Sequence, residues 1–144
     1  MAGSSGPDAV RDQPRRKRAP ILPGSVLDEL ILEALGGSDV PLGAYAIAGC
    51  LRDRWRPGNV MAIYRSLDRL AKRGLVERVE SLSAYRPRTL AQAVLLACSQ
   101  CGTTTPLPVI GEFQRIEQAV RVTGFALDKL ALEAVGVCEQ CRRD

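Results

Sequence analysis

The residues best suited to chemistry are four cysteines that form two identical pairs. Cys98 and Cys101 make one pair, and Cys138 and Cys141 make the other. A two-residue spacing lets both thiolates of a pair point at one ion, and two such pairs complete a tetrahedral site. This pattern predicts one structural zinc ion per chain, bound by four thiolates with no open position for water. Redox dithiols and disulfides stay open as alternatives.

Residues typical of catalysis are missing from the sequence. It contains no histidine, which is the usual proton shuttle near neutral pH and the commonest transition-metal ligand. It has no phosphate-binding loop and no nucleophile with a recognisable partner. We therefore expect no enzymatic activity and no small-molecule substrate. The fifth cysteine, Cys50, is predicted to be a buried small hydrophobe, with redox sensing as the alternative.

Positive charge is concentrated in two stretches of the chain. The net charge is only +4, but residues 51–75 carry seven basic and two acidic side chains. Residues 1–20 carry five basic and two acidic side chains. Such a concentration is typical of a surface that binds a polyanion such as nucleic acid. A solvated helix face is the alternative interpretation.

Residues 57–75 predict a short basic helix. Its apolar residues recur at helical spacing and form one stripe: Val60, Ile63, Leu67 and Leu70. The side opposite this stripe carries Met61, Arg65, Asp68, Arg69 and Lys72, with Tyr64 on the flank. We expect that face to enter a groove of double-stranded DNA. The residues predicted to contact DNA from this stretch are Asn59, Tyr64, Arg65 and Arg69.

Residues 1–22 predict a disordered basic tail, because they are rich in Gly, Ser, Pro and charge and show no apolar period. The basic run within it could follow phosphates or enter a minor groove, and consists of Arg15, Arg16, Lys17 and Arg18. A solubilising tail without a binding site is the alternative.

Residues 23–87 predict a winged-helix domain that binds DNA. We expect a first helix with Ser25 as its N-cap, ending at Gly36. A second helix is predicted over residues 42–54, with Tyr45, Ala48 and Leu51 pointing inward. The basic helix follows, and then strands over residues 75–80 and 84–88 make a hairpin. Three short helices followed by a hairpin are typical of a winged helix-turn-helix.

Residues 88–144 predict a small α/β domain that contains the zinc site. An apolar run over 91–98 leads to the first cysteine pair. A helix follows, ended by Gly124, with four apolar residues at helical spacing: Ile110, Phe113, Ile116 and Val120. Residues 125–137 are predicted to be a strand. The whole chain is thus expected to be α+β. With no signal peptide and no apolar run long enough to cross a bilayer, it is expected to be cytoplasmic.

The order of these features resembles the ferric uptake regulator (Fur) family, and within it the zinc uptake regulator branch. The resemblance covers residues 23–141 and rests on these motifs: Pro41-Leu-Gly-Ala-Tyr45, Val60-x2-Ile63-Tyr64-Arg65-Ser-Leu67-Asp68-x-Leu70, Gly74-Leu-Val76, Cys98-x2-Cys101-Gly102 and Gly136-Val-Cys138-x2-Cys141. It implies a homodimer formed through the C-terminal domain and a palindromic DNA operator. It also implies that Tyr64 and Arg65 are the pair facing the groove.

The chain departs from the family where the family binds its sensory metal. Family members use histidines between the domains, but here Glu77 follows Gly74-Leu-Val76, and the run over 86–94 has neither histidine nor cysteine. Pro106 and Val135 stand where further ligands are usual. The resemblance therefore implies a repressor that keeps its structural zinc and has lost histidine-based metal sensing. Alternatives are a zinc-responsive repressor with unconventional ligands, and a winged-helix module that binds a protein partner.

Overall fold

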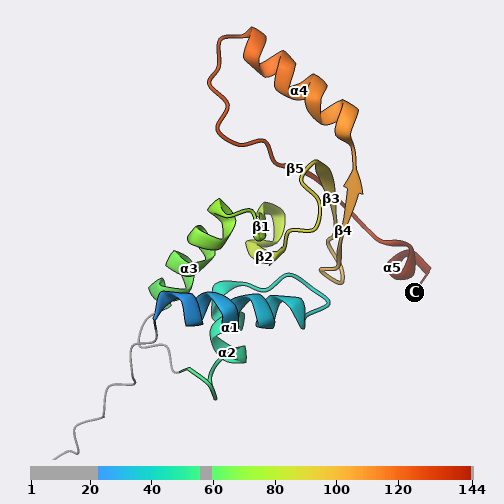
Figure 1. Cartoon of the computed structure of the whole chain (residues 1–144). Coiled ribbons are helices and arrows are strands. Elements are labelled where there is room, and N and C mark those ends of the chain that lie inside the picture. The colour runs from blue at the N-terminus through green and yellow to red at the C-terminus, as the bar shows by residue number, and fades with distance from the viewer. Residues whose placement is uncertain (1–22, 56–59, 144) are drawn as a thin grey trace, which may run out of the picture.

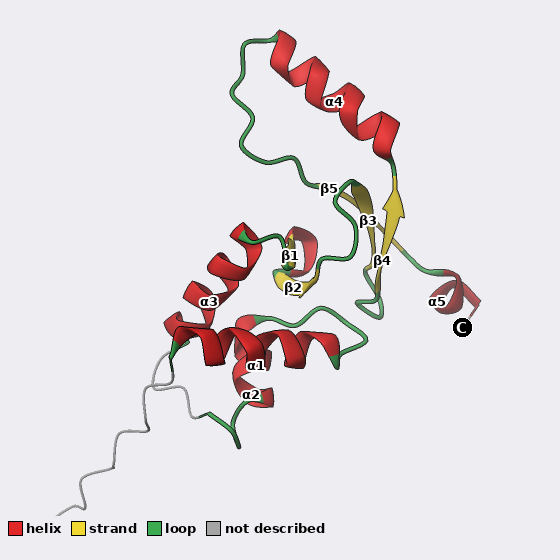
Figure 2. Ribbon diagram, in the orientation of Figure 1, coloured by secondary structure: helices red, strands yellow, loops and turns green. Residues whose placement is uncertain are grey.

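The structure is a computed structural model that describes residues 23–55 and 60–143 (Figure 1). The predicted basic tail, with Arg15, Arg16, Lys17 and Arg18, lies outside these residues, and so does Asn59. Helices dominate the first half of the described chain, and a sheet organises the second half (Figure 2). None of the helices in the described ranges is both long enough and apolar enough to span a membrane.

Helix α1 (Gly24–Gly36) begins earlier than predicted. The carbonyl of Pro23 accepts hydrogen bonds from the amides of Val26 (3.0 Å) and Leu27 (3.3 Å). Ser25 therefore already lies within the helix, and no side chain caps the first turn. The prediction of Ser25 as N-cap is wrong, because a backbone carbonyl rather than a hydroxyl starts the hydrogen-bond ladder.

Two further helices complete the N-terminal bundle. Helix α2 (Ala44–Cys50) is shorter than the helix predicted over 42–54, because the chain turns after residue 50. The turn is closed by the carbonyl of Leu51, which accepts hydrogen bonds from two later amides. Helix α3 (Met61–Lys72) falls inside the predicted range of 57–75.

The inward side of α2 agrees with the prediction at Leu51, which is buried, and at Ala48, which packs against the core, but differs from it at Tyr45. Ala44, Ile47 and Leu51 are buried, at the i, i+3, i+7 spacing of one helix face. Tyr45, predicted to point inward, has 76% of its surface exposed. Cys50, predicted to be buried, is exposed. Both predictions are wrong because the inward face runs through residue 47, which turns residues 45 and 50 toward solvent.

A hairpin follows α3 and forms the predicted wing. Its elements are β1 (Val76–Val79), the 3-10 helix η1 (Glu80–Leu82) and β2 (Ala84–Pro87). The strands pair antiparallel, within one residue of the ranges predicted at both ends. Leu42 adds a bridge to Tyr85 through two backbone hydrogen bonds of 2.9 Å. The wing is therefore anchored to the segment that leads into α2.

The second half of the chain is built on a three-stranded sheet of order β4-β3-β5. Its elements are β3 (Ala93–Cys98), β4 (Thr104–Pro108), α4 (Ile110–Val122), β5 (Leu132–Gly136) and α5 (Glu139–Arg143). The central strand β3 pairs antiparallel with β4 and parallel with β5. Figure 2 shows α4 projecting away from the sheet, with a long loop that returns from its far end to β5.

The predictions for this half are correct in part. The helix that ends before Gly124 is confirmed as α4. Of the strand predicted over 125–137, only residues 132–136 are a strand, because residues 125–131 form the returning loop. Strand β4 is not among the predicted elements, and it contains Pro106 and Pro108, which disfavour a central strand. Prolines are tolerated here because β4 is at the edge of the sheet.

Most of the buried apolar residues in the described ranges belong to two clusters. The larger one is the core of the winged helix and contains residues of α1, α2, α3 and β1. The smaller one consists of Val79 from the wing with Leu95 and Ala97 from β3, and Leu82 packs against it. The wing therefore shares apolar packing with the C-terminal sheet.

Candidate functional site

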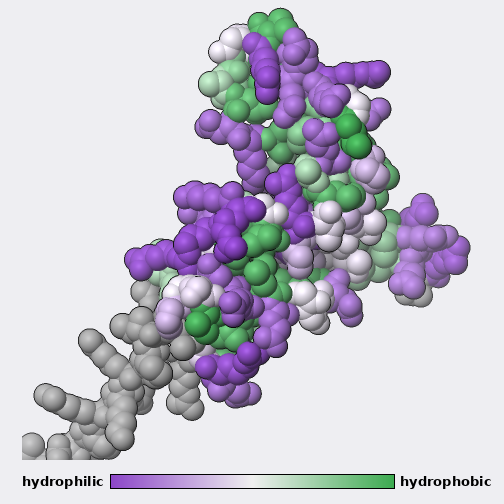
Figure 3. All heavy atoms as spheres, in the orientation of Figure 1, coloured by the Kyte–Doolittle hydropathy of each residue, from purple (hydrophilic) through white to green (hydrophobic). Residues whose placement is uncertain are grey.

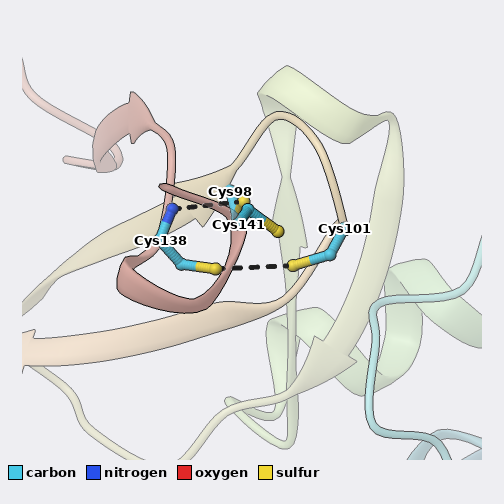
Figure 4. Close-up of side chains that lie close together, drawn as sticks. All are labelled: Cys98, Cys101, Cys138 and Cys141. Atoms are coloured by element: carbon cyan, nitrogen blue, oxygen red, sulfur yellow. Dashed lines mark hydrogen bonds between the residues drawn. The ribbon is translucent and has the colours of Figure 1, made fainter. Parts of the chain in front are cut away.

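The four paired cysteines meet at one end of the C-terminal sheet (Figure 4). Cys98 ends β3, and Cys101 lies in the turn before β4. Cys138 precedes α5, and Cys141 lies within it. The parallel pairing of β3 with β5 sets Cys98 opposite Gly136, so the second pair follows at the same edge of the sheet.

Backbone hydrogen bonds fix the two cysteine loops. Gly102 has a φ of +74°, a conformation that glycine adopts without steric cost, and its amide donates to the carbonyl of Cys98 (3.0 Å). The amide of Ser99 donates to the carbonyl of Gly136 (2.8 Å), which joins the loop after β3 to the end of β5. Both loops are thus held in place by contacts other than those among the sulfurs.

The geometry of the cluster fits a tetrahedral metal ion. All four Sγ atoms lie within 4.8 Å of one another. Cys101 Sγ and Cys138 Sγ are 3.8 Å apart, whereas a disulfide needs about 2.05 Å. An ion with zinc–sulfur bonds of about 2.3 Å sets its sulfurs about 3.8 Å apart. The predicted zinc ligands are therefore brought together in an arrangement consistent with structural zinc.

The electrostatics of the cluster also favour a cation. Hydrogen bonds from the backbone amides of Cys101, Cys138 and Gln100 lower the pKa of Cys98 to about 6. Close contact with the other sulfurs, that of Cys138 above all, raises the pKa of Cys141 to about 12. The thiol of Cys141 therefore resists ionisation beside the other sulfurs, and the +2 charge of a zinc ion at the centre would offset part of the negative charge of the thiolates.

Helix α3 buries three of the four residues of the predicted stripe and exposes the opposite side, while Val60, just before the helix, is partly buried. Ile63, Leu67 and Leu70 are completely buried. Tyr64 and Arg65, the pair predicted to face a groove, are exposed next to each other. The outer face of α3 thus presents a phenol ring and a guanidinium group to solvent.

Arg69, also predicted to contact DNA, makes contacts within the fold. Its Nη2 donates to Asp28 Oδ1 on α1 (2.7 Å) and to Ser66 Oγ (2.8 Å). The Asp28 side chain is 10% exposed, whereas that of Arg69 is 46% exposed. Arg69 therefore ties α3 to α1 and still reaches the surface, and its contact with DNA stays a prediction.

Glu77, which the resemblance predicts to replace a histidine, faces Arg86 across the wing. Glu77 Oε1 and Arg86 Nε are 3.8 Å apart, with side chains 20% and 13% exposed. Burial raises the pKa of Glu77, although Arg86, Arg88 and Lys129 act to lower it. Arg86 Nη1 is buried and has no hydrogen-bond partner among the described residues. The carboxylate of Glu77 thus already has a cationic side chain, that of Arg86, beside it.

One contact between the two halves of the chain was not predicted. The carboxylate of Glu133, on β5, accepts hydrogen bonds from the backbone amides of Glu80 (2.5 Å) and Ser81 (3.0 Å) in η1. Beside it lies a cleft of about 440 Å³ between α3, the wing and the C-terminal half. Charged groups of both signs line the cleft, Lys72, Glu77 and Lys129 among them. Local sequence patterns carry no signal for such a contact, since 52 residues separate Ser81 from Glu133.

Comparison with known proteins finds regulators that are similar to this chain in sequence. No family model matches the chain. Its sequence is 26% identical over 116 residues to the zinc uptake regulation proteins of Escherichia coli strain K12 and Shigella flexneri. The alignment covers 77% of this chain and 68% of each relative.

Solved structures decide the fold. A zinc uptake regulator in complex with zinc and DNA superposes with a TM-score of 0.74 at 24% identity, over 81% of each chain. The ferric uptake regulator of Helicobacter pylori superposes with a TM-score of 0.58 at 20% identity, over 84% of this chain and 83% of that one. The chain has the Fur fold.

The predicted α+β fold with a C-terminal four-cysteine cluster is thereby confirmed as Fur-like. By sequence and by fold, the chain is similar to zinc uptake regulators. These relatives are regulators and not enzymes, in agreement with the expectation from the sequence.

Proposed function

We propose that this protein is a dimeric, sequence-specific DNA-binding transcription regulator of the Fur family, acting as a repressor in the cytoplasm. The observation that carries the proposal is the outer face of α3, where Tyr64 and Arg65 are exposed above a completely buried stripe. The same fold occurs in a zinc uptake regulator bound to DNA. A helix of this kind in a winged-helix unit fits the major groove.

The exposed pair supplies two kinds of base contact. Tyr64 packs on a thymine methyl group, and Arg65 donates hydrogen bonds to a purine edge or to a phosphate. Further contacts come from Asn59 and Arg69 around the helix. Phosphate contacts come from the basic tail, through Arg15, Arg16, Lys17 and Arg18.

A second copy of the chain provides the partner. The resemblance implies that the copies pair through the C-terminal domain, and a palindromic operator matches such a twofold symmetry. Apolar side chains are exposed in this domain, including Val122, Phe125 and Val135. Figure 3 shows apolar surface interleaved with polar surface over α4, at the top of the view. Pairing of two chains would remove such apolar surface from water.

Each chain binds one structural zinc ion through Cys98, Cys101, Cys138 and Cys141, and DNA binding does not need a second metal ion. Support for the second statement comes from the ion pair of Glu77 with Arg86, at the position where the family has a metal ligand. A further cation at this place would be repelled by Arg86 and by the nearby Arg88 and Lys129.

Metal counting combined with DNA titration tests the proposal. The purified protein is expected to contain one zinc ion per chain and to bind a palindromic duplex, selected from a random-sequence library, after treatment with a mild chelator. Two transition-metal ions per chain, with DNA binding lost when one is removed and the four-cysteine zinc is retained, would point instead to a metal-responsive repressor. Failure to select any duplex at two salt concentrations would favour a protein-interaction module.

A further inference from the structure

We infer that Glu133 is a positioning residue that fastens the wing to the C-terminal sheet, so that α3 keeps one orientation without a ligand between the domains. The inference rests on the proposed function, because orientation matters only if α3 binds DNA. In this protein one side chain would join the two domains, at the place where the resemblance leads us to expect a bound metal ion between them.

The contact uses both oxygens of the carboxylate. Glu133 Oε1 accepts from the amide of Glu80 (2.5 Å), and Oε2 accepts from the amide of Ser81 (3.0 Å). Two adjacent amides at the start of η1 have no partner inside that short helix, and a carboxylate supplies two acceptors at once. Burial alone would raise the pKa of Glu133, but these hydrogen bonds and Lys129 hold it below the ordinary value. The ionised form is thus the one that binds the wing.

Apolar packing supports the same joint from the other side. Val79, directly before Glu80, is completely buried, and it clusters with Leu95 and Ala97 of β3. Leu82, at the end of η1, packs against this cluster. Val79 and Leu82 thus pack on either side of the two amides that bond to Glu133. This packing opposes sliding and rotation of the wing relative to the C-terminal sheet.

The segment between α3 and the wing, residues 73–75, is short and fixed by backbone hydrogen bonds. The amides of Gly74 and Leu75 donate to the carbonyls of Ala71 (2.9 Å) and Leu70 (3.0 Å), which closes the end of the helix. Val76, the first residue of β1, is buried in the same core as Leu70. Because α3 and β1 share this core, fixing η1 on the C-terminal sheet also fixes the direction of α3.

Amide hydrogen exchange, followed by NMR in the full-length zinc-loaded protein without DNA, tests the joint itself. In Glu133→Gln the amides of Glu80 and Ser81 are expected to exchange at least about tenfold faster, because an amide side chain offers one acceptor instead of two. The amide of Leu67, inside α3, should keep its protection, which shows that the domain stays folded. Glu112→Gln is the matched control, since Glu112 is exposed and has no hydrogen bond or ion pair in the described part of the chain.

DNA titration then tests the effect on orientation. The ligands are the palindromic duplex that wild-type protein selects and the same duplex with one half-site scrambled. Glu133→Ala is expected to weaken binding to the palindrome by about tenfold or more and to leave half-site binding within about twofold. Unchanged exchange at Glu80 and Ser81, or unchanged affinity for the palindrome, would overturn the inference. If wild-type protein selects no duplex, the proposed function fails, and the exchange rates still decide whether the joint exists.

Discussion

Arg69 Nη2 on α3 lies 2.7 Å from Asp28 Oδ1 on α1, and the carboxylate is almost completely buried. The contact joins the last third of α3 to the first turns of α1. Arg73 Nη1 lies 4.0 Å from the other oxygen of the same carboxylate. Asp28 thus faces two cations, and part of the basic character of α3 serves the fold.

Replacing this carboxylate should destabilise the winged helix. Asp28→Ala is expected to lower the free energy of unfolding by about 1–3 kcal/mol, because a hydrogen bond between charged groups is lost and Arg69 keeps only its neutral acceptors. Urea unfolding followed by circular dichroism measures the change. Glu29→Ala is the matched control, since Glu29 is exposed on the same helix and should change stability by less than about 0.5 kcal/mol. Equal losses in the two variants would contradict the assigned role of Asp28.

Arg65 and Arg69, which lie one turn apart on α3, should differ in their effects: one on DNA affinity and the other on the free energy of unfolding. Arg65→Ala is expected to cost about 1–3 kcal/mol of affinity for the selected duplex without changing the free energy of unfolding. Arg69→Ala should lower the free energy of unfolding, since its hydrogen bonds to Asp28 and Ser66 are lost. Titration on matched and scrambled duplexes, alongside urea unfolding, measures both effects. A loss at Arg65 that is equal on all sequences would make it a phosphate contact.

Patterns within single segments predicted much of this molecule. The stripe of α3 could be predicted because Ile63, Leu67 and Leu70 repeat at the helical period and lie among polar residues. The cysteine cluster could be predicted because two CxxC pairs have few other uses in a chain without histidine. Both signals lie in spacing along the chain.

Features that depend on contacts between distant segments could not be predicted. Tyr45 is exposed because neighbouring helices pack against residues 44 and 47, and periodicity alone allowed either face. Glu133 meets Ser81 only because the wing packs on the C-terminal sheet. Strand β4 carries prolines that local propensity opposes, and its pairing with β3 outweighs that preference.

Removing one zinc ligand should disrupt the C-terminal domain. Cys138→Ser is expected to reduce the zinc content from one ion per chain to none and to lower the midpoint of thermal unfolding, because metal binding contributes folding free energy. Elemental analysis and calorimetry measure these two changes. Cys50→Ser is the matched control, since Cys50 is exposed and lies outside the cluster. Zinc retained in Cys138→Ser would contradict the four-thiolate site.

Acid should weaken the joint between the wing and the sheet. The pKa of Glu133 lies below its ordinary value of 4.5, so the unfolded chain binds more protons at this site than the folded one between those two values. The ionised contact therefore contributes stability at neutral pH that is lost as pH falls from about 4.5 through the folded-state pKa. Among the charged neighbours, Lys129 favours ionisation of Glu133, whereas the charge of Glu133 in turn helps to raise the pKa of Glu77. Urea unfolding of wild type and of Glu133→Gln, from pH 7 downward, measures the difference in their free energies of unfolding at each pH. Any destabilisation from zinc loss at low pH affects both proteins and drops out of this difference. The difference should shrink toward zero with acidification, and a difference that stays constant with pH would show that the charge of Glu133 does not support the joint.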